Sequence, residues 1–168
     1  MASSTDIEAA AQKYIESYAA AMHLAHSSPA TPIPDIAKAL GSHYLPGLVS
    51  LTHGHIVSAP HFTDAKASAA SIEKHLEKFV NSGVGVDIRL KKSRVETIEG
   101  VGGSALCFLT WAIFPTEGWK GEAWHWENCY FYRRKPDGTE GWEGIVSDGE
   151  VEGMIKNIPE AFDLGGAS

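Results

Sequence analysis

Cysteine, positive charge and long apolar runs are all scarce in this sequence, and each scarcity excludes a class of protein. The 168 residues include only two cysteines, Cys107 and Cys129, which are too few for a disulfide framework. Both lie in apolar, strand-like segments, so we expect buried, reduced thiols and a reducing compartment. Lysine and arginine total 14 against 21 acidic residues, which gives a net charge of −7. Nucleic acid binding needs a basic face, so no nucleic acid partner is expected.

Membrane and export signals are missing as well. No apolar stretch reaches the roughly 18 residues that a bilayer-spanning helix needs, so no membrane partner is expected. The N-terminal segment MASSTDIEAAAQ lacks a basic region followed by an apolar run, which is the pattern of a signal peptide. A cytoplasmic protein is therefore expected.

Several catalytic and binding motifs are also absent. The chain contains no G-x-S-x-G, H-E-x-x-H, C-x-x-C or P-loop pattern. What the sequence does contain is ordinary globular composition, with 43% hydrophobic and 21% charged residues. Without an internal repeat or a dividing linker, residues 1–168 are expected to form a single domain with an ordered core at about 6–157.

Helical patterns dominate the first half of the chain. Tyr14, Tyr18 and Met22 recur every four residues and form one apolar stripe. A second apolar stripe, in a later segment, consists of Ile72, Leu76, Phe79 and Val80. The expected helices are at about 6–25, 35–43 and 63–82, with a short helical tail at about 149–157.

The second half has the character of β-structure. Long strands are expected at about 86–98, 104–114, 122–134 and 141–147, and a short strand or hairpin with Gly54 at its bend at 48–57. The short connections between the long strands require antiparallel neighbours. Three helices are available to cover the apolar face of this sheet. The fold class predicted is therefore α+β, with a curved antiparallel sheet wrapped by N-terminal helices.

This order of elements resembles the nuclear transport factor 2-like superfamily, which includes the SnoaL-like cyclases, ketosteroid isomerase and scytalone dehydratase. Two stretches carry the resemblance at residue level, Tyr44-Leu45-Pro46-Gly47-Leu48-Val49-Ser50-Leu51 and the segment from Tyr130-Phe131-Tyr132 through Pro136-Asp137-Gly138 to Trp142. The resemblance implies a cone-shaped, cystatin-like α+β barrel, a pocket between sheet and helices, a homodimer and no cofactor. Fold alone does not fix the chemistry.

His53 is the first candidate for that chemistry. It shares strand parity with Val49 and Leu51, which we expect to face the core. In ketosteroid isomerase-like members this strand carries the general base, and an ungapped reading places that base at Thr52, one residue away. A histidine could replace it; the alternative is a histidine in a surface turn.

His125 and Glu127 form the second group. The resemblance places the parity of residues 125, 127 and 129 inward, where an apolar pocket would make Glu127 a candidate acid or base. The alternative for Glu127 is an exposed cross-strand pair with Arg89, Arg94 or Lys120. If the opposite face, with Trp124, Trp126 and Tyr130, looks inward instead, the pocket is mainly an apolar container, and the sequence leaves this choice open.

Asp148, at the end of the last strand, is the fourth catalytic candidate, with a helix cap as its alternative role. Aromatic residues are expected to bind the substrate or shape the pocket; these candidates are Tyr18, Tyr44, Trp111, Phe131, Trp124 and Trp126.

A metal site is not expected. His53 and His55 have the spacing of two ligands on one strand face, but Gly54 breaks the strand and a third ligand, such as His61, is unspecified.

The resemblance favours a cofactor-independent isomerase, dehydratase or cyclase that acts by acid–base catalysis in a closed pocket. Its substrate would be a small hydrophobic secondary metabolite, polyketide- or terpenoid-like. The alternative is a non-catalytic small-ligand-binding or dimerisation domain of the same fold.

Overall fold

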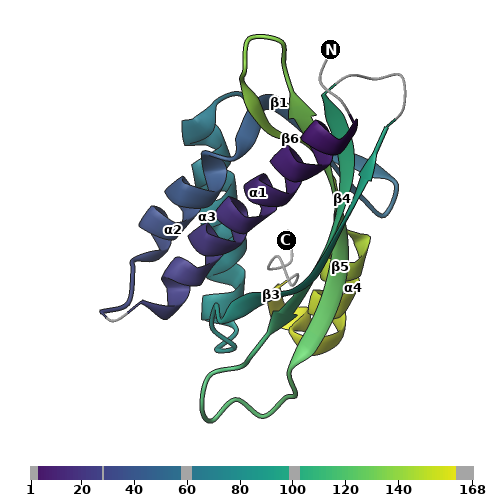
Figure 1. Ribbon diagram of the computed structural model, residues 1–168. Coiled ribbons are helices and arrows are strands. Elements are labelled where there is room, and N and C mark those ends of the chain that lie inside the picture. The colour runs from purple at the N-terminus through teal and green to yellow at the C-terminus, as the bar shows by residue number, and fades with distance from the viewer. Residues whose placement is uncertain (1–3, 28, 58–61, 99–102, 162–168) are drawn as a thin grey trace.

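The computed structural model describes residues 4–27, 29–57, 62–98 and 103–161, and within them helices pack on one side of a curved sheet (Figure 1). The helices lie close to their predicted positions, and the predicted α+β class is confirmed. They are α1 (Ser4–His23), α2 (Ile33–Gly41), α3 (Ala65–Asn81) and α4 (Asp148–Asn157), with short 3₁₀ turns at Leu24–His26 and Pro159–Ala161.

Six strands form the sheet, in the order β2-β1-β6-β5-β4-β3. The strands are β1 (Tyr44–Thr52), β2 (His55–Val57), β3 (Ile88–Thr97), β4 (Ser104–Ile113), β5 (Trp124–Arg134) and β6 (Glu140–Val146). The four long strands are antiparallel neighbours, as their short connections predicted. Among the strands of the described residues, the one parallel pair is β1 with β6. A parallel pair needs a long crossover connection, and the chain between these two strands supplies it.

The helix α1 carries the spacing that predicted it. Ile7, Ala11, Ile15, Tyr18 and Met22 recur every three or four residues and are buried. This stripe faces the sheet. Figure 1 shows α1 lying over the concave side of the sheet, with α2 and α3 beside it. The sheet is thus covered on its concave side by three helices.

The helix α3 begins at a side-chain cap and buries one face. The carboxylate of Asp64 accepts a hydrogen bond from the backbone N–H of Ala67 at 2.8 Å, which satisfies one of the free donors of the first turn. Ile72, Leu76 and Phe79 point into the core. The prediction that Val80 belongs to this face is wrong, because its side chain is 45% exposed.

The turn between β1 and β2 has a backbone that few residues adopt. His53 has φ 49° and Gly54 has φ 75°. Positive φ at both central residues is the requirement of a tight two-residue hairpin. The bend expected at Gly54 is confirmed, and it includes His53.

His43 is buried where α2 ends and β1 begins. Its Nδ1 lies 3.0 Å from the carbonyl oxygen of Ala39, and its Nε2 lies 3.0 Å from the hydroxyl of Ser17. The rings of Tyr14 and Tyr18 pack against its edges. Burial lowers the pKa of His43, because the charged imidazolium loses its hydration inside the protein.

The depressed pKa of His43 predicts that the protein loses stability in mild acid. The unfolded chain takes up a proton at His43 below about pH 6.5, whereas the folded chain resists it. The contribution of neutral His43 to the free energy of unfolding is therefore complete above about pH 6.5. It falls as the pH drops toward the lower pKa that His43 has in the folded state. Urea unfolding between pH 7.5 and 5 should show a falling free energy of unfolding, with a shallower slope in His43→Gln. An identical slope in the variant would rule this origin out.

Candidate functional site

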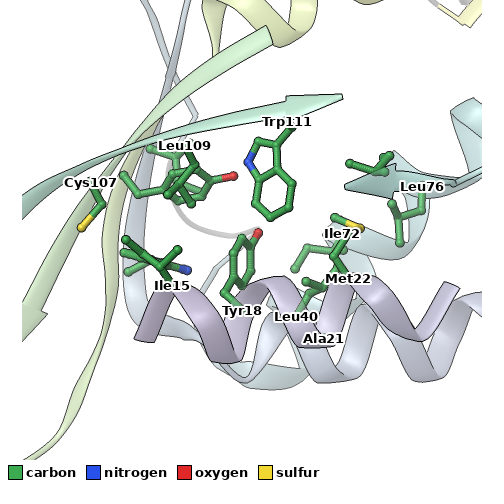
Figure 2. Packing of buried hydrophobic residues seen from close by; sticks show 14 of the residues in the cluster. Ile15, Tyr18, Ala21, Met22, Leu40, Ile72, Leu76, Cys107, Leu109 and Trp111 are labelled. Atoms are coloured by element: carbon green, nitrogen blue, oxygen red, sulfur yellow. The ribbon is translucent and has the colours of Figure 1, made fainter. Parts of the chain in front are cut away.

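A cavity of about 380 Å³ lies between the concave face of the sheet and the helices. Figure 2 shows Trp111 of β4 pointing toward Tyr18 of α1, with Met22 and Leu40 nearby. Its apolar wall includes Met22, Leu40, Phe62, Ile72, Leu76 and Trp111. The volume is within the range of small-molecule sites. The lining reaches the surface at His75, whose side chain is 38% exposed, so the pocket is not fully closed.

A carboxylate held by two donors lies in the cavity lining. Glu150, in the first turn of α4, has its Oε1 2.8 Å from Nε2 of His75 on α3. Its Oε2 accepts a hydrogen bond of 2.7 Å from Nδ2 of Asn128 on β5. These three residues therefore tie α3, β5 and α4 together at one polar point.

Three tyrosines continue this polar point across the cavity. The hydroxyls of Tyr18 and Tyr44 lie 3.0 Å apart. The ring of Tyr130 packs against that of Tyr18, with centroids 5.6 Å apart, and Tyr130 follows Asn128 by two residues on the same face of β5. The six side chains line the cavity as one polar chain, in the order Tyr44, Tyr18, Tyr130, Asn128, Glu150 and His75. Hydrogen bonds join Tyr44 to Tyr18, Asn128 to Glu150, and Glu150 to His75.

Burial sets the ionisation of the three phenols. It raises the pKa of Tyr18, Tyr44 and Tyr130 well above the ordinary value, because a phenolate in this apolar surrounding would lose its hydration. All three therefore remain neutral near pH 7. Neutral phenols keep their protons and can donate hydrogen bonds to an oxygen that gains negative charge.

Two opposing effects act on the pKa of Glu150. Burial alone would raise its pKa, but the charge of His75 and the hydrogen bonds from His75 and Asn128 outweigh burial and lower it. Glu150 is therefore ionised near pH 7. A carboxylate with a lowered pKa is a poor proton acceptor and a good partner for a positive charge.

Four of the six predicted substrate-binding residues line the cavity. They are Tyr18, Tyr44, Trp111 and Trp126. Trp124 lies instead beside Trp119, with ring centroids 5.8 Å apart, and against Gly153 of α4. Phe131 is on the outer face of the sheet, where the guanidinium of Arg133 lies over its ring.

The four predicted catalytic residues lie outside the cavity lining. The expectation that Val49, Leu51 and His53 face the core is wrong, because Leu48 is buried while Val49 and Leu51 are each 37% exposed. His53 is exposed in the β1–β2 turn, where its backbone N–H donates to the carboxylate of Asp148 at 2.6 Å. This hydrogen bond connects the β1–β2 turn to Asp148, the first residue of α4. The side chain of Asp148 does not cap that helix.

The expected orientation of strand 122–134 is also wrong. Trp126, Asn128 and Tyr130 are buried, whereas His125 and Glu127 are exposed. The large aromatic residues fill the concave side, and the 125/127 parity faces outward. Glu127 accepts a long hydrogen bond of 3.4 Å from Thr110. No ion pair of Glu127 with Arg89, Arg94 or Lys120 was found among the described residues.

Four residues of the polar chain were not among the sequence candidates, namely His75, Glu150, Asn128 and Tyr130. Helical spacing carried a signal for two of them. His75 follows Ile72 by three residues and precedes Phe79 by four, so it borders the buried face of α3. Glu150 precedes the buried Met154 by four residues and lies on the same side of α4.

The thiols and the candidate metal ligands complete the description. Cys107 is buried and Cys129 half-buried, and both are free. Burial raises the pKa of Cys107 to about 12, so it is a poor nucleophile. The described residues contain no cluster of three or more His, Cys, Asp or Glu side chains suited to a metal ion. His61 lies outside the described residues. Among the described helices, none is long and apolar enough to cross a membrane.

Comparisons with known proteins find the fold in solved structures only. No family model and no curated protein sequence matches the chain. Mtr2 of Candida albicans superposes with a TM-score of 0.55 at 12% identity, covering 84% of this chain and 94% of that one. Aln2 of a Streptomyces species gives 0.53 at 14%, with 83% and 89% covered. An NTF-2 like protein of unknown function from Shewanella oneidensis gives 0.53 at 8%, with 80% and 92% covered.

The chain has the nuclear transport factor 2-like fold, as the order of its elements predicted. This fold is shared by isomerases and by non-catalytic proteins. Identities of 8–14% define a fold and no activity. The function must therefore be inferred from the cavity itself.

Proposed function

We propose that the protein is an acid–base enzyme, an isomerase, dehydratase or cyclase, acting on a small, largely apolar compound that carries a carbonyl group. The observation that carries this proposal is the polar chain from Tyr44 to His75 along one cavity. It supplies a proton acceptor at one end and neutral donors at the other. Apolar walls between them limit contact with water, which strengthens both. The proposed chemistry uses side chains alone.

His75 is the proposed proton acceptor. Its Nε2 is engaged by Glu150 at 2.8 Å, and its Nδ1 has no hydrogen-bond partner among the described residues. The ionised Glu150 orients the ring and stabilises the imidazolium that forms when a proton arrives. Asn128, which donates to the other oxygen of Glu150, positions that carboxylate.

The proposed step removes a proton from the carbon next to the carbonyl. The C–H bond breaks as an N–H bond forms on His75, and the electron pair moves to the carbonyl oxygen. Tyr18 or Tyr130 donates a hydrogen bond to the resulting oxyanion. Return of the proton from His75 to another carbon gives isomerisation. Transfer of that proton to a β-hydroxyl group, which leaves as water while the C–O bond breaks, gives dehydration. Attack of the new carbanion on a second carbonyl, whose oxygen then takes the proton from His75, gives cyclisation.

A two-ring ketone tests this step without knowledge of the substrate. The enzyme in D₂O should exchange the α-protons of 2-tetralone for deuterium, followed by proton NMR, at a rate that exceeds the buffer rate and saturates with ketone concentration. A rate equal to that of buffer would contradict the proposal. Binding of the ketone without exchange would favour the alternative, a non-catalytic small-ligand-binding domain.

We also propose that a second copy of the chain covers the outer face of the sheet at β1, β2 and β6. Val49, Leu51, Ile56 and Val146 are between 37% and 68% exposed there. The register places Leu51 opposite both Ile56 and Val146. Neighbouring exposed apolar side chains are typical of an interaction surface rather than of scattered surface residues.

Light scattering after size-exclusion chromatography tests the homodimer. The wild type is expected at twice the mass of the chain, and the double variant Leu51→Glu/Ile56→Glu at the mass of one chain, because charges opposed across an apolar interface lose their hydration. The control is Val80→Glu on α3, which should remain dimeric. A monomeric wild type, or a dimeric double variant, would exclude this interface.

A further inference from the structure

Three polar atoms in the cavity lining have no hydrogen-bond partner among the described residues. They are Nε1 of Trp111, Nε1 of Trp126 and Oδ1 of Asn128. Their side chains belong to residues that are only 2%, 5% and 2% exposed. Buried polar atoms in native proteins are nearly always hydrogen-bonded. These three atoms are therefore positioned to be satisfied by a ligand in the cavity.

The three atoms come from one patch of the sheet. Trp111 on β4 is directly opposite Trp126 on β5, a relation that brings two side chains on the same face within contact. Asn128 follows Trp126 by two residues and therefore lies on that same face. We call these three residues the indole–amide patch. A single small molecule lying on the sheet can reach all of it.

The polarity of each atom is fixed by its chemistry and its neighbours. An indole N–H can only donate. The amide of Asn128 uses its Nδ2 to donate to Glu150 at 2.7 Å, and a carboxylate accepts only, so the Oδ1 of Asn128 is the atom left over and it accepts. The patch therefore offers two donors and one acceptor.

The neighbouring ring does not satisfy the donor of Trp126. The centroid of the Phe79 ring lies 6.4 Å from the centroid of the Trp126 ring, and the two ring planes differ by only 15°. An indole N–H points outward in the plane of its own ring, so it does not point at the face of a ring stacked parallel to it. This donor remains available to a ligand atom at the edge of the indole.

We infer that the molecule bound in the cavity is an oxygenated ring compound with two acceptor oxygens for the indole N–H groups and a hydroxyl group that donates to Asn128. This inference rests on the proposed function, since it describes the molecule on which His75 would act. It adds a requirement that an acid–base pair does not impose. A plain hydrocarbon or a simple monoketone leaves at least one of the three atoms unsatisfied, and each unmade hydrogen bond lowers affinity about fivefold.

Three two-ring probes of similar size test the inference by equilibrium dialysis. Naphthalene has no polar atom, 2-acetonaphthone has one carbonyl acceptor, and 6-hydroxy-2-acetonaphthone adds a hydroxyl that both donates and accepts. The expected affinities rise in that order, with at least about tenfold between the first and the last. Equal affinities for the three probes, or no binding of any up to its solubility limit, would overturn the inference.

Tryptophan-to-phenylalanine variants identify the donors. Trp126→Phe and Trp111→Phe should lose most of the preference for 6-hydroxy-2-acetonaphthone over naphthalene while keeping the naphthalene affinity within about threefold. Trp142→Phe is the matched control, because its Nε1 is also buried without a partner among the described residues but does not line the cavity. An unchanged preference in both cavity variants, or a loss of equal size in Trp142→Phe, would contradict the assignment.

Binding and catalysis fail separately in this design. The probe preference should survive in His75→Gln, because His75 is outside the indole–amide patch. A preference that is present while 2-tetralone exchange is absent would retain the ligand class and reject the enzyme. Exchange of 2-tetralone without a probe preference would retain the enzyme and reject the ligand class.

Discussion

Replacing His75 with glutamine is expected to slow α-proton exchange of 2-tetralone by about a hundredfold or more. General acid–base groups contribute on the order of 10²–10⁴ to a rate, and glutamine can still donate to Glu150 but cannot accept a proton near pH 7. The affinity for the ketone should stay within about threefold, because the apolar walls are untouched. NMR exchange rates at saturating ketone, together with equilibrium dialysis, measure both quantities.

His125→Gln provides the matched control for this prediction. The substitution is chemically identical, but His125 is exposed on the outer side of β5 and does not line the cavity. Its exchange rate should equal that of the wild type. Equal losses in His125→Gln and His75→Gln would point to a general effect on the fold, and no loss in either would remove His75 from the mechanism.

Trp142→Ala is expected to cost about 3–5 kcal/mol in free energy of unfolding, the range for a buried tryptophan cut to alanine. Trp142 is fully buried. Its ring centroid lies 5.0 Å from that of Tyr130, 5.1 Å from Tyr14 and 5.6 Å from Tyr18. The change would open a hole beneath the tyrosines of the site. Its indole N–H has no partner to lose among the described residues, so the cost comes from packing alone.

Urea unfolding followed by circular dichroism measures this cost, and Trp119→Ala is the comparison. Trp119 is only half-buried and lies in the connection before β5. Its substitution should cost clearly less, about 1 kcal/mol, the usual size of a single-site effect outside the core. A cost below about 1 kcal/mol for Trp142→Ala would mean that the aromatic cluster is not the support of the cavity.

The sequence was sufficient to predict the order of elements because each one carries a clear period. The stripe of α1 at Tyr14, Tyr18 and Met22, and the runs of β-branched and aromatic residues in the second half, do not depend on distant contacts. The parallel pairing of β1 with β6 was beyond this reasoning, because it joins segments about a hundred residues apart, such as Tyr44 and Trp142, and no local pattern links them.

Which face of a strand looks inward could not be predicted, because both faces of β1 and of β5 carry apolar residues. In β1, Val49 and Leu51 are apolar residues on the outer face, and Leu48 is an apolar residue on the core face. Phe131 and Cys129 compete with Trp126 and Tyr130 in β5. Alternation identifies the core face only when the other face is polar. The strand at 48–57 was therefore assigned the wrong orientation, with His53 inward, and the resemblance implied the wrong face for the strand at 122–134, with His125 and Glu127 inward.

The central polar group escaped prediction for a different reason. His75 and Glu150 are 75 residues apart and lie on two different helices, α3 and α4. Their hydrogen bond depends on α4 folding back across β5 toward α3, which no local pattern indicates. The tyrosine end of the chain was partly predicted, since Tyr18 and Tyr44 were both candidates for binding the substrate.

A crystal structure with 2-tetralone bound tests the central claim most directly. The proposed site predicts the two rings inside the cavity, on the indole–amide patch. The carbonyl oxygen should lie within about 3.2 Å of a tyrosine hydroxyl, and an α-carbon should face Nδ1 of His75. A ketone found only on the outer face of the sheet, or one that enters the cavity with its α-carbons turned away from His75, would contradict the assignment of this cavity as an acid–base site.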